Sequence, residues 1–138
     1  MIHKICEAAD AGAYPSRNDF MDMLTRNPHI AAQGYNIFGK IFFWNKASAY
    51  LYGYRESEAI NQDLVELIIP PEMQQLVRDT LLAARKTGNM HDPSPCDLLN
   101  SNGEYITVYS GHVVFQWDQA TTPEFYCIDL ALDTDIAE

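Results

Sequence analysis

One amphipathic helix that separates two groups of strand-like segments constrains the fold more than any other feature. Pro70 and Pro71 open this helix, and Gly88 ends it. Between them a mostly apolar stripe recurs every three or four residues: Met73, Leu76, Val77, Thr80, Leu81 and Ala84. The spacing predicts a helix over residues 72–87 with this stripe turned toward a core.

Strand-like segments lie on both sides of the helix. Two precede it, at residues 30–36 and 40–44, and three follow it, at 96–99, 105–115 and 125–132. Asn102-Gly103 separates the third from the fourth and suits a tight hairpin turn. Asn45 caps a short helix whose end Gly53 marks, and a helical stretch follows at residues 56–60. Strands that cluster at both ends predict an α+β class with an antiparallel sheet.

Length and composition predict one globular domain, since 138 residues are 47% hydrophobic and 20% charged. No window reaches the roughly 18 apolar residues of a membrane span, and charged residues interrupt residues 1–12 where a signal peptide needs an apolar core. We therefore expect a cytoplasmic protein with no membrane partner. Three scattered cysteines suit reduced thiols better than a disulfide framework or a zinc site.

Charge is distributed unevenly along the chain. The formal net charge is −10, and residues 91–138 hold nine acidic residues and no Lys or Arg. A surface built from this third of the chain repels phosphates, so we expect no nucleic-acid partner. A solvated acidic face that keeps the domain soluble is the simpler interpretation of the same residues.

Residues 1–28 are predicted to form a helical leader. Ser16 can cap a short helix that places Phe20, Met23 and Leu24 on one face, and Asn27-Pro28 ends it. Such a short helix is not stable alone in water. The leader must therefore dock on the domain that follows or on a partner copy.

Several short motifs together resemble the PAS family, a family of sensory domains. They lie at residues 39–45 (GKIFFWN), 51–54 (LYGY), 57–61 (SEAIN), 68–72 (IIPPE) and 100–104 (NSNGE), with a closing motif at Asp135 or Asp133. The likeness covers about residues 29–138. Asn61 stands where the family usually has glycine, a mild change because asparagine tolerates the left-handed region, and Ala137 replaces the usual threonine.

The resemblance implies a PAS-like five-stranded antiparallel sheet with helices packed on one face, preceded by the helical leader. It divides the chain into a leader, 1–28, and a sensory domain, 29–138. Such domains usually regulate an effector such as a histidine kinase or a cyclic dinucleotide synthase module. The 138 residues contain no such module, so the chain is an input module, a fragment of a larger sensor or a free-standing regulator.

No cofactor is expected. Haem-binding members of the family carry a histidine on the long helix, and residues 72–87 contain none. Flavin photosensors carry a cysteine beside an asparagine before that helix and an arginine for the phosphate, and residues 61–64 contain neither. His112 and Cys127 could form a nucleophile pair, but nothing in the sequence sets their distance, and we expect no catalytic role for them.

A pocket for a small uncharged molecule is the predicted binding site, with an ordinary filled core as the alternative. If the last two strands follow the family's parity, they turn six side chains toward the helices: Thr107, Tyr109, Gly111, Phe125, Cys127 and Asp129. Leu76 and Thr80 face them, and Tyr50 and Tyr54 close one side.

Two functions of different class follow. One is a non-enzymatic sensory and dimerisation module. The other is a small cone-shaped α+β enzyme, of isomerase or dehydratase type, with buried Asp129 as its base. The position of the long helix between the second and third strands favours the sensor.

Burial and self-association complete the expectations. The predicted core comprises Ile41, Phe43, Leu51, Leu76, Val77, Ile106, Val108 and Ile128. The other sheet face would carry Ile106, Val108, Val114, Tyr126, Ile128 and Leu130, a larger apolar patch than monomers usually expose. The leader is its natural cover, from the same chain or from a partner. We therefore predict a homodimer whose interface includes Phe20, Met23 and Leu24 with Ile128 and Leu130.

Overall fold

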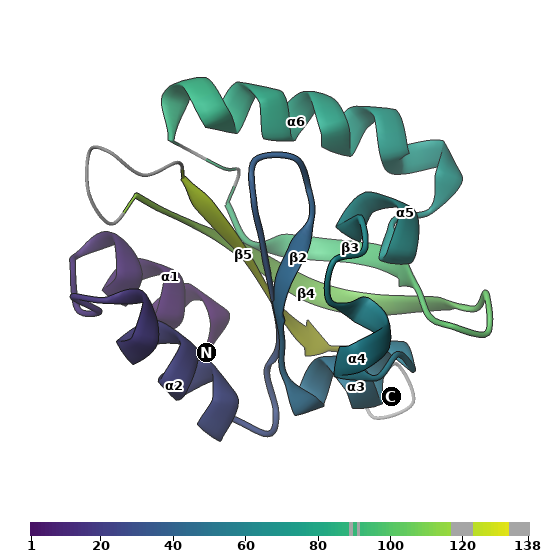
Figure 1. Cartoon of the computed structure of the whole chain (residues 1–138), viewed down its shortest axis with the longest axis horizontal. Helices are drawn as coiled ribbons and strands as arrows, with labels where there is room; N and C mark the ends of the chain where they lie inside the picture. Colours follow the sequence, from purple (N-terminus) through teal and green to yellow (C-terminus); the bar gives the residue numbers. More distant parts are fainter. Residues whose placement is uncertain (89, 91, 117–122, 133–138) are drawn as a thin grey trace.

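The computed structural model describes residues 1–138 except 89, 91, 117–122 and 133–138, and these residues form one sheet with helices on both of its faces (Figure 1). The predicted closing motif at Asp133 or Asp135, and Ala137 with it, lies outside the described residues. The five strands pair antiparallel in the order β2-β1-β5-β4-β3. Their bounds are β1 Ala31–Tyr35, β2 Ile41–Trp44, β3 Ser94–Leu99, β4 Tyr105–Phe115 and β5 Glu124–Ala131.

The helices divide between the two sheet faces. The face that we call outer carries the leader helices, α1 (Ile2–Asp10) and α2 (Arg17–Arg26). The inner face carries the helices between β2 and β3: α3 Lys46–Tyr52, α4 Glu56–Ala59, α5 Leu64–Ile68, the short 3₁₀ helix η1 Pro71–Met73, and α6 Gln74–Thr87. The predicted α+β architecture and element order are therefore confirmed.

Capping residues start and end the helices where the sequence predicts. Ser16 Oγ accepts a hydrogen bond from the Asp19 amide at the start of α2, and Asn45 Oδ1 accepts one from the Ser48 amide at the start of α3. Gly53 and Gly88 adopt the left-handed conformation after α3 and α6. Asn61 takes the same conformation, with φ of 72°, as expected for asparagine in place of glycine.

The predicted apolar stripe of α6 is confirmed at Leu81 and Ala84, but the predicted burial of Leu76 is wrong. Leu76 is 58% exposed, whereas Leu81 and Ala84 are buried and Val77 is half-buried. The side chains four and seven residues after Val77 therefore face the sheet, and Leu76 lies at the edge of the helix contact. Of the other predicted core residues, Ile41, Val108 and Ile128 are fully buried and Phe43, Leu51 and Ile106 are half-buried.

The predicted facing of β4 is also wrong. In the register with β5, Ser110 pairs with Asp129 and His112 pairs with Cys127, so these four residues share the inner face. Thr107, Tyr109 and Gly111 therefore face outward, while Ile106, Val108 and Val114 face inward with the inner core. The predicted facing of β5 is correct. Strand side chains alternate, so an offset of one residue reverses every assignment on a strand.

The leader covers the outer face of its own chain. Phe20 and Leu24 are fully buried there, and the Phe20 ring meets Phe115 and Tyr126 edge-on with centroids 4.9 Å apart. Three of the five residues predicted for a dimer interface, Phe20, Leu24 and Ile128, are thus buried within one chain, and Met23 and Leu130 are half-buried. A dimer through these residues requires the leader to leave its own sheet.

Among the described helices, none is long and apolar enough to cross a membrane.

Candidate ligand cavity

A cavity of about 630 Å³ lies between the inner face and the α5–α6 segment. Its helix side is almost wholly apolar: Leu64, Ile68, Ile69, Pro70, Met73, Leu76, Val77 and Leu81, with Thr80. Its sheet side carries more polar groups, which come from Ser94, Cys96 and Asp97 on β3, Tyr105, Ser110 and His112 on β4, and Cys127 on β5. An apolar wall opposite a few polar groups is the usual composition of a small-molecule site.

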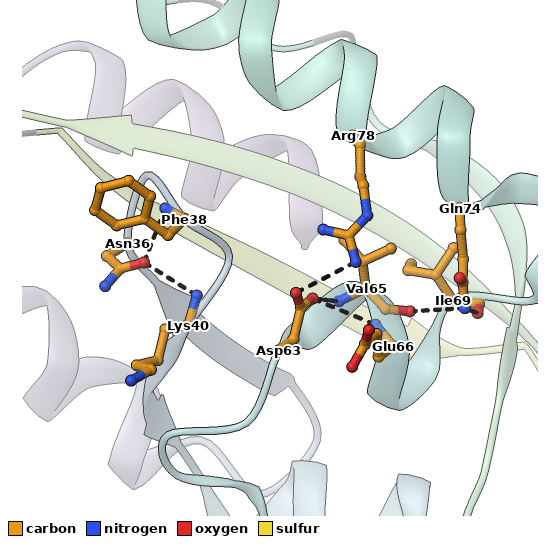
Figure 2. A network of polar contacts seen from close by, with 9 residues as sticks. All are labelled: Asn36, Phe38, Lys40, Asp63, Val65, Glu66, Ile69, Gln74 and Arg78. Atoms are coloured by element: carbon orange, nitrogen blue, oxygen red, sulfur yellow. Dashed lines mark hydrogen bonds and ion pairs between the residues drawn. The ribbon is translucent and has the colours of Figure 1, made fainter.

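Polar contacts fix the helix wall in place, as Figure 2 shows. Asp63 is the N-cap of α5, where its Oδ1 accepts hydrogen bonds from the amides of Val65 and Glu66 at 2.8 and 3.3 Å. Its Oδ2 lies 3.3 Å from Arg78 Nη2 on α6. One carboxylate thus starts α5 and ties it to α6.

The turn between α5 and α6 is held in the same way. Gln74 Nε2 on α6 donates to the carbonyl oxygens of Ile69 and Val65, at 3.1 and 3.4 Å, which satisfies two acceptors at the end of α5 (Figure 2). The β1–β2 hairpin forms a bridge to Asp63 through Lys40, and Asn36 Oδ1 closes this hairpin by accepting from the amides of Phe38 and Lys40. The cavity wall is therefore preorganised by short-range polar contacts.

A side-chain contact joins η1 to β4 beside the cavity. The Tyr105 hydroxyl donates a hydrogen bond to the Glu72 carboxylate, and this bond lowers the pKa of Glu72. Both residues line the cavity, as do the exposed side chains of Met73 and Leu76. Glu72 therefore carries its negative charge at neutral pH, on the rim of the cavity.

A buried carboxylate lies next to the sheet side of the cavity. Asp129 is fully buried on the inner face, as predicted, and its Oδ2 accepts a hydrogen bond of 2.6 Å from the Tyr52 hydroxyl of α3. Its Oδ1 and the Oε1 of Gln33 have no hydrogen-bond partner among the described residues. Burial raises the pKa of Asp129, although hydrogen bonds to the carboxylate oppose the shift.

The two thiols of the cavity are poor nucleophiles. Burial raises the pKa of Cys127 well above its ordinary value and that of Cys96 to about 11, with the charge of Asp129 as the next cause for both. Cys127 Sγ lies 3.6 Å from Ser110 Oγ. Protonated at neutral pH, these groups act as small, weakly polar parts of the wall. Within the described part of the chain, no three His, Cys, Asp or Glu side chains are grouped to hold a metal ion.

The predicted site residues do not all gather at this cavity. Leu76, Thr80 and Cys127 line it, and Asp129 lies inward but is not among the lining residues. Tyr50 is 93% exposed, and Tyr54 packs against Trp44, whose Nε1 donates to the Tyr54 carbonyl. These two tyrosines therefore do not close one side of the cavity.

The three β4 residues predicted to face the cavity, Thr107, Tyr109 and Gly111, lie on the other face because that strand faces the other way. Thr107 donates to Asp97, and the Tyr109 hydroxyl lies 2.6 Å from His3 Nε2 of the leader. In their place the structure brings Ser110 and His112 to the cavity, with Val77 and Leu81 opposite them. Ser110 and His112 can be identified from the sequence only if the alternating inward and outward positions along β4 are assigned correctly.

Comparison with known proteins agrees with this geometry. The family described as PAS fold matches residues 31–92. A PAS domain from Colwellia psychrerythraea is 21% identical, with a TM-score of 0.67 over 77% of this chain and 88% of that chain. A PAS domain from Desulfitobacterium hafniense is 16% identical, with a TM-score of 0.66 over 80% and 99% of the two chains.

A third solved structure contains a bound molecule. It is the PAS domain of the Cronobacter turicensis RpfR quorum-sensing receptor in complex with C12:0, which is 14% identical, with a TM-score of 0.59 over 76% of this chain and 95% of that chain. Among curated protein sequences, no significant match to this chain was found. At these identities, the likeness to the solved structures establishes the fold.

Proposed function

We propose that this protein is a sensory module of signal transduction that binds a small uncharged molecule. Residues 31–92 match the PAS family, and the five-stranded sheet is arranged as in the PAS fold. The cavity between the inner face and α5–α6 carries this proposal. Its volume of about 630 Å³ lies in the range of small-molecule sites.

The charges around the cavity favour an uncharged ligand. None of the described lining residues is Lys or Arg, and residues 91–138 contain neither. Glu72 is ionised on the rim, Asp97 is a second acidic lining residue, and Asp129 lies on the inner face beside Ser110 and Cys127. A carboxylate that entered the cavity would lose its hydration without gaining a strong cation, which is costly. A hydroxyl or carbonyl group could instead bond to Ser110 or His112.

Two measurements test ligand binding. Native mass spectrometry of protein freshly purified from its own host should show a small molecule that travels with the chain. Thermal unfolding should then shift upward with 1-dodecanol, a twelve-carbon probe chosen because a fold neighbour is in complex with C12:0. Dodecanoate should bind at least about tenfold more weakly, because its carboxylate must be desolvated.

A matched pair of variants separates cavity binding from surface binding. Val77→Phe places a larger side chain in the cavity and should abolish the dodecanol shift, whereas Leu82→Phe enlarges an exposed side chain on the same helix and should preserve it. No copurified molecule and no probe shift would contradict ligand binding. Equal or tighter binding of dodecanoate would contradict an uncharged ligand alone.

Self-association and an effector belong to the same proposal. A second copy could accept the leader on its outer face, which gives a homodimer whose interface includes Phe20, Met23 and Leu24 with Ile128 and Leu130. Sedimentation velocity at micromolar concentration tests it, and a protein that sediments only as a monomer contradicts it. The effector would be a histidine kinase or cyclic dinucleotide synthase module, and coexpression with such modules should change their output when the cavity is filled.

The enzyme alternative loses its geometric basis. Asp129 Oδ2 is occupied by the Tyr52 hydroxyl, and the side chain does not line the cavity, so it is not placed to act as a base on a bound substrate. We propose a non-catalytic role, in keeping with the general character of PAS domains.

A further inference from the structure

The side chain of Asn45 lies where α2, β1 and α3 meet. Its Oδ1 accepts hydrogen bonds from the amides of Ala32 and Ser48, each at 3.0 Å. Its Nδ2 donates to the carbonyl oxygens of Leu24 and Ile30, at 3.1 and 2.8 Å. Asn45 is 6% exposed, so both donors and both acceptor positions of one amide are used out of contact with bulk water.

The bond to Leu24 joins the leader to the core. Leu24 lies in the last turn of α2, where helix carbonyls lack partners within the helix. Its other acceptor contact is local, from the amide of Asn27 at 3.3 Å. Asn45 Nδ2 therefore links the sheet domain to this end of the leader by a hydrogen bond.

Two other polar contacts of the leader lie nearer to water, and a third, from Cys6 Sγ to the His112 carbonyl at 3.8 Å, is part-buried. The Arg17–Glu124 ion pair, at 2.6 Å, has an Arg17 side chain that is 43% exposed, and the His3–Tyr109 contact is exposed. Exposed pairs contribute little because water screens them. A buried acceptor that loses its donor has a larger free-energy cost.

We propose that Asn45 is a positioning residue that holds the leader on the outer face through its Nδ2, separately from its role as N-cap of α3 through its Oδ1. The two roles use different atoms of one amide, so they can be separated by substitution. Loss of the donor shifts the equilibrium toward opening of the leader, which uncovers Tyr126 and Ile128 while the core remains folded. This inference does not depend on a ligand in the cavity.

Asn45→Asp tests the proposal because it changes only one half of the amide. Aspartate is as good an N-cap as asparagine, so it can still accept from Ser48 and Ala32. It cannot donate to Leu24 or Ile30, and it sets a carboxylate oxygen against their carbonyls. Amide hydrogen exchange in α2 should become about tenfold faster or more, whereas exchange in β4 and β5 should stay within about twofold.

Asn36→Asp is the matched control. Asn36 Oδ1 also accepts from two backbone amides, those of Phe38 and Lys40, but no contact joins it to the leader in the described structure. This variant should leave α2 exchange unchanged. Asn45→Ser is the second test variant, since it keeps an uncharged cap but removes Nδ2 and its two N–H donors to Leu24 and Ile30, and it should also accelerate exchange in α2.

Two results would overturn the proposal. One is unchanged α2 exchange in both Asn45 variants, which would mean that apolar packing alone holds the leader. The other is an equal rise in α2, β4 and β5, which would mean that Asn45 supports the whole core. If the aspartate variant does not fold, the serine variant decides by the same criteria.

Discussion

Tyr52 donates its hydroxyl to Asp129 Oδ2 at 2.6 Å, which links α3 to β5 across 77 residues of sequence. Both side chains are fully buried. Burial raises the pKa of Tyr52 well above its ordinary value, with the charge of Asp129 as the second cause, so Tyr52 remains the donor. The other carboxylate oxygen has no hydrogen-bond partner among the described residues, nor has Gln33 Oε1.

The first prediction concerns the pH dependence of stability. Burial raises the folded pKa of Asp129 above its unfolded value of about 3.9. The fold therefore favours the protonated form of Asp129. The stability that Asp129 contributes is complete below the unfolded pKa and is lost as pH rises through the folded pKa. Urea unfolding from pH 4 upward should show this loss in the parent protein, while Asp129→Asn should remove it.

The same variant supplies a missing donor. An asparagine at 129 can accept from Tyr52 and donate to Gln33 Oε1. We therefore expect the free energy of unfolding of this variant at pH 8 to equal that of the parent or to exceed it by about 1 kcal/mol. Asp129→Leu is the control, since it leaves the Tyr52 hydroxyl unpaired and should be destabilised. A pH dependence identical in the parent and the asparagine variant would show that Asp129 has an ordinary pKa.

The second prediction concerns the hydroxyl of Tyr52. Tyr52→Phe removes the donor to a buried carboxylate and should lower the free energy of unfolding by about 1–3 kcal/mol. Tyr50→Phe, two residues earlier on α3, removes the hydroxyl of a side chain that is 93% exposed and should change stability by less than about 0.5 kcal/mol. Equal effects of the two changes in urea unfolding would argue against a stabilising Tyr52–Asp129 bond.

The third prediction concerns the orientation of α6. Leu81→Ala should lower the free energy of unfolding by about 2–5 kcal/mol, because Leu81 is buried against the sheet side of the helix. Leu76→Ala should cost less than about 1 kcal/mol, because Leu76 is mostly exposed. Equilibrium denaturation of both variants measures these two costs. A larger cost at Leu76 would show that a different face of α6 contacts the sheet.

The fourth prediction concerns the seat of α1 on β4. A Cβ at Gly111 would lie 2.5 Å from Ile2 Cγ2 and 3.0 Å from Cys6 Sγ, so Gly111→Ala should cost about 1–3 kcal/mol through overpacking. Ile2→Ala makes room for this methyl group. The two changes together should therefore cost at least about 0.5 kcal/mol less than the sum of the single changes. Strict additivity in a double-mutant cycle would mean that α1 does not rest on Gly111.

Local sequence signals predicted the elements of this fold and their ends. Ser16 and Asn45 start helices because their side-chain oxygens accept amides only three residues away. Gly53 and Gly88 adopt left-handed backbone because glycine has no Cβ, and Asn61 does so because asparagine tolerates this region. The Asp63 cap of α5 depends on adjacent residues in the same way.

The composition of the cavity depends on contacts between distant segments. Sequence alternation along β4 does not tell which face is which, because the leader covers one sheet face and α3–α6 cover the other, so both sets of side chains are apolar. Only the pairing of Ser110 with Asp129 places Ser110 and His112 in the cavity and Gly111 beneath α1. The rotation of α6, which exposes Leu76, depends in the same way on packing against the sheet.

The sequence by itself thus determined the order of the elements, their caps and the resemblance to the PAS family, whose model matches residues 31–92, because each signal lies within a few neighbouring residues or in a short motif. Only the tertiary structure decided which face of β4 lines the cavity, that the leader packs on its own chain, and that Asn45 joins the leader to α3 and β1. These outcomes depend on strand register and on packing between segments far apart in the chain. A shift of one residue in that register exchanges the two sheet faces without changing any local propensity.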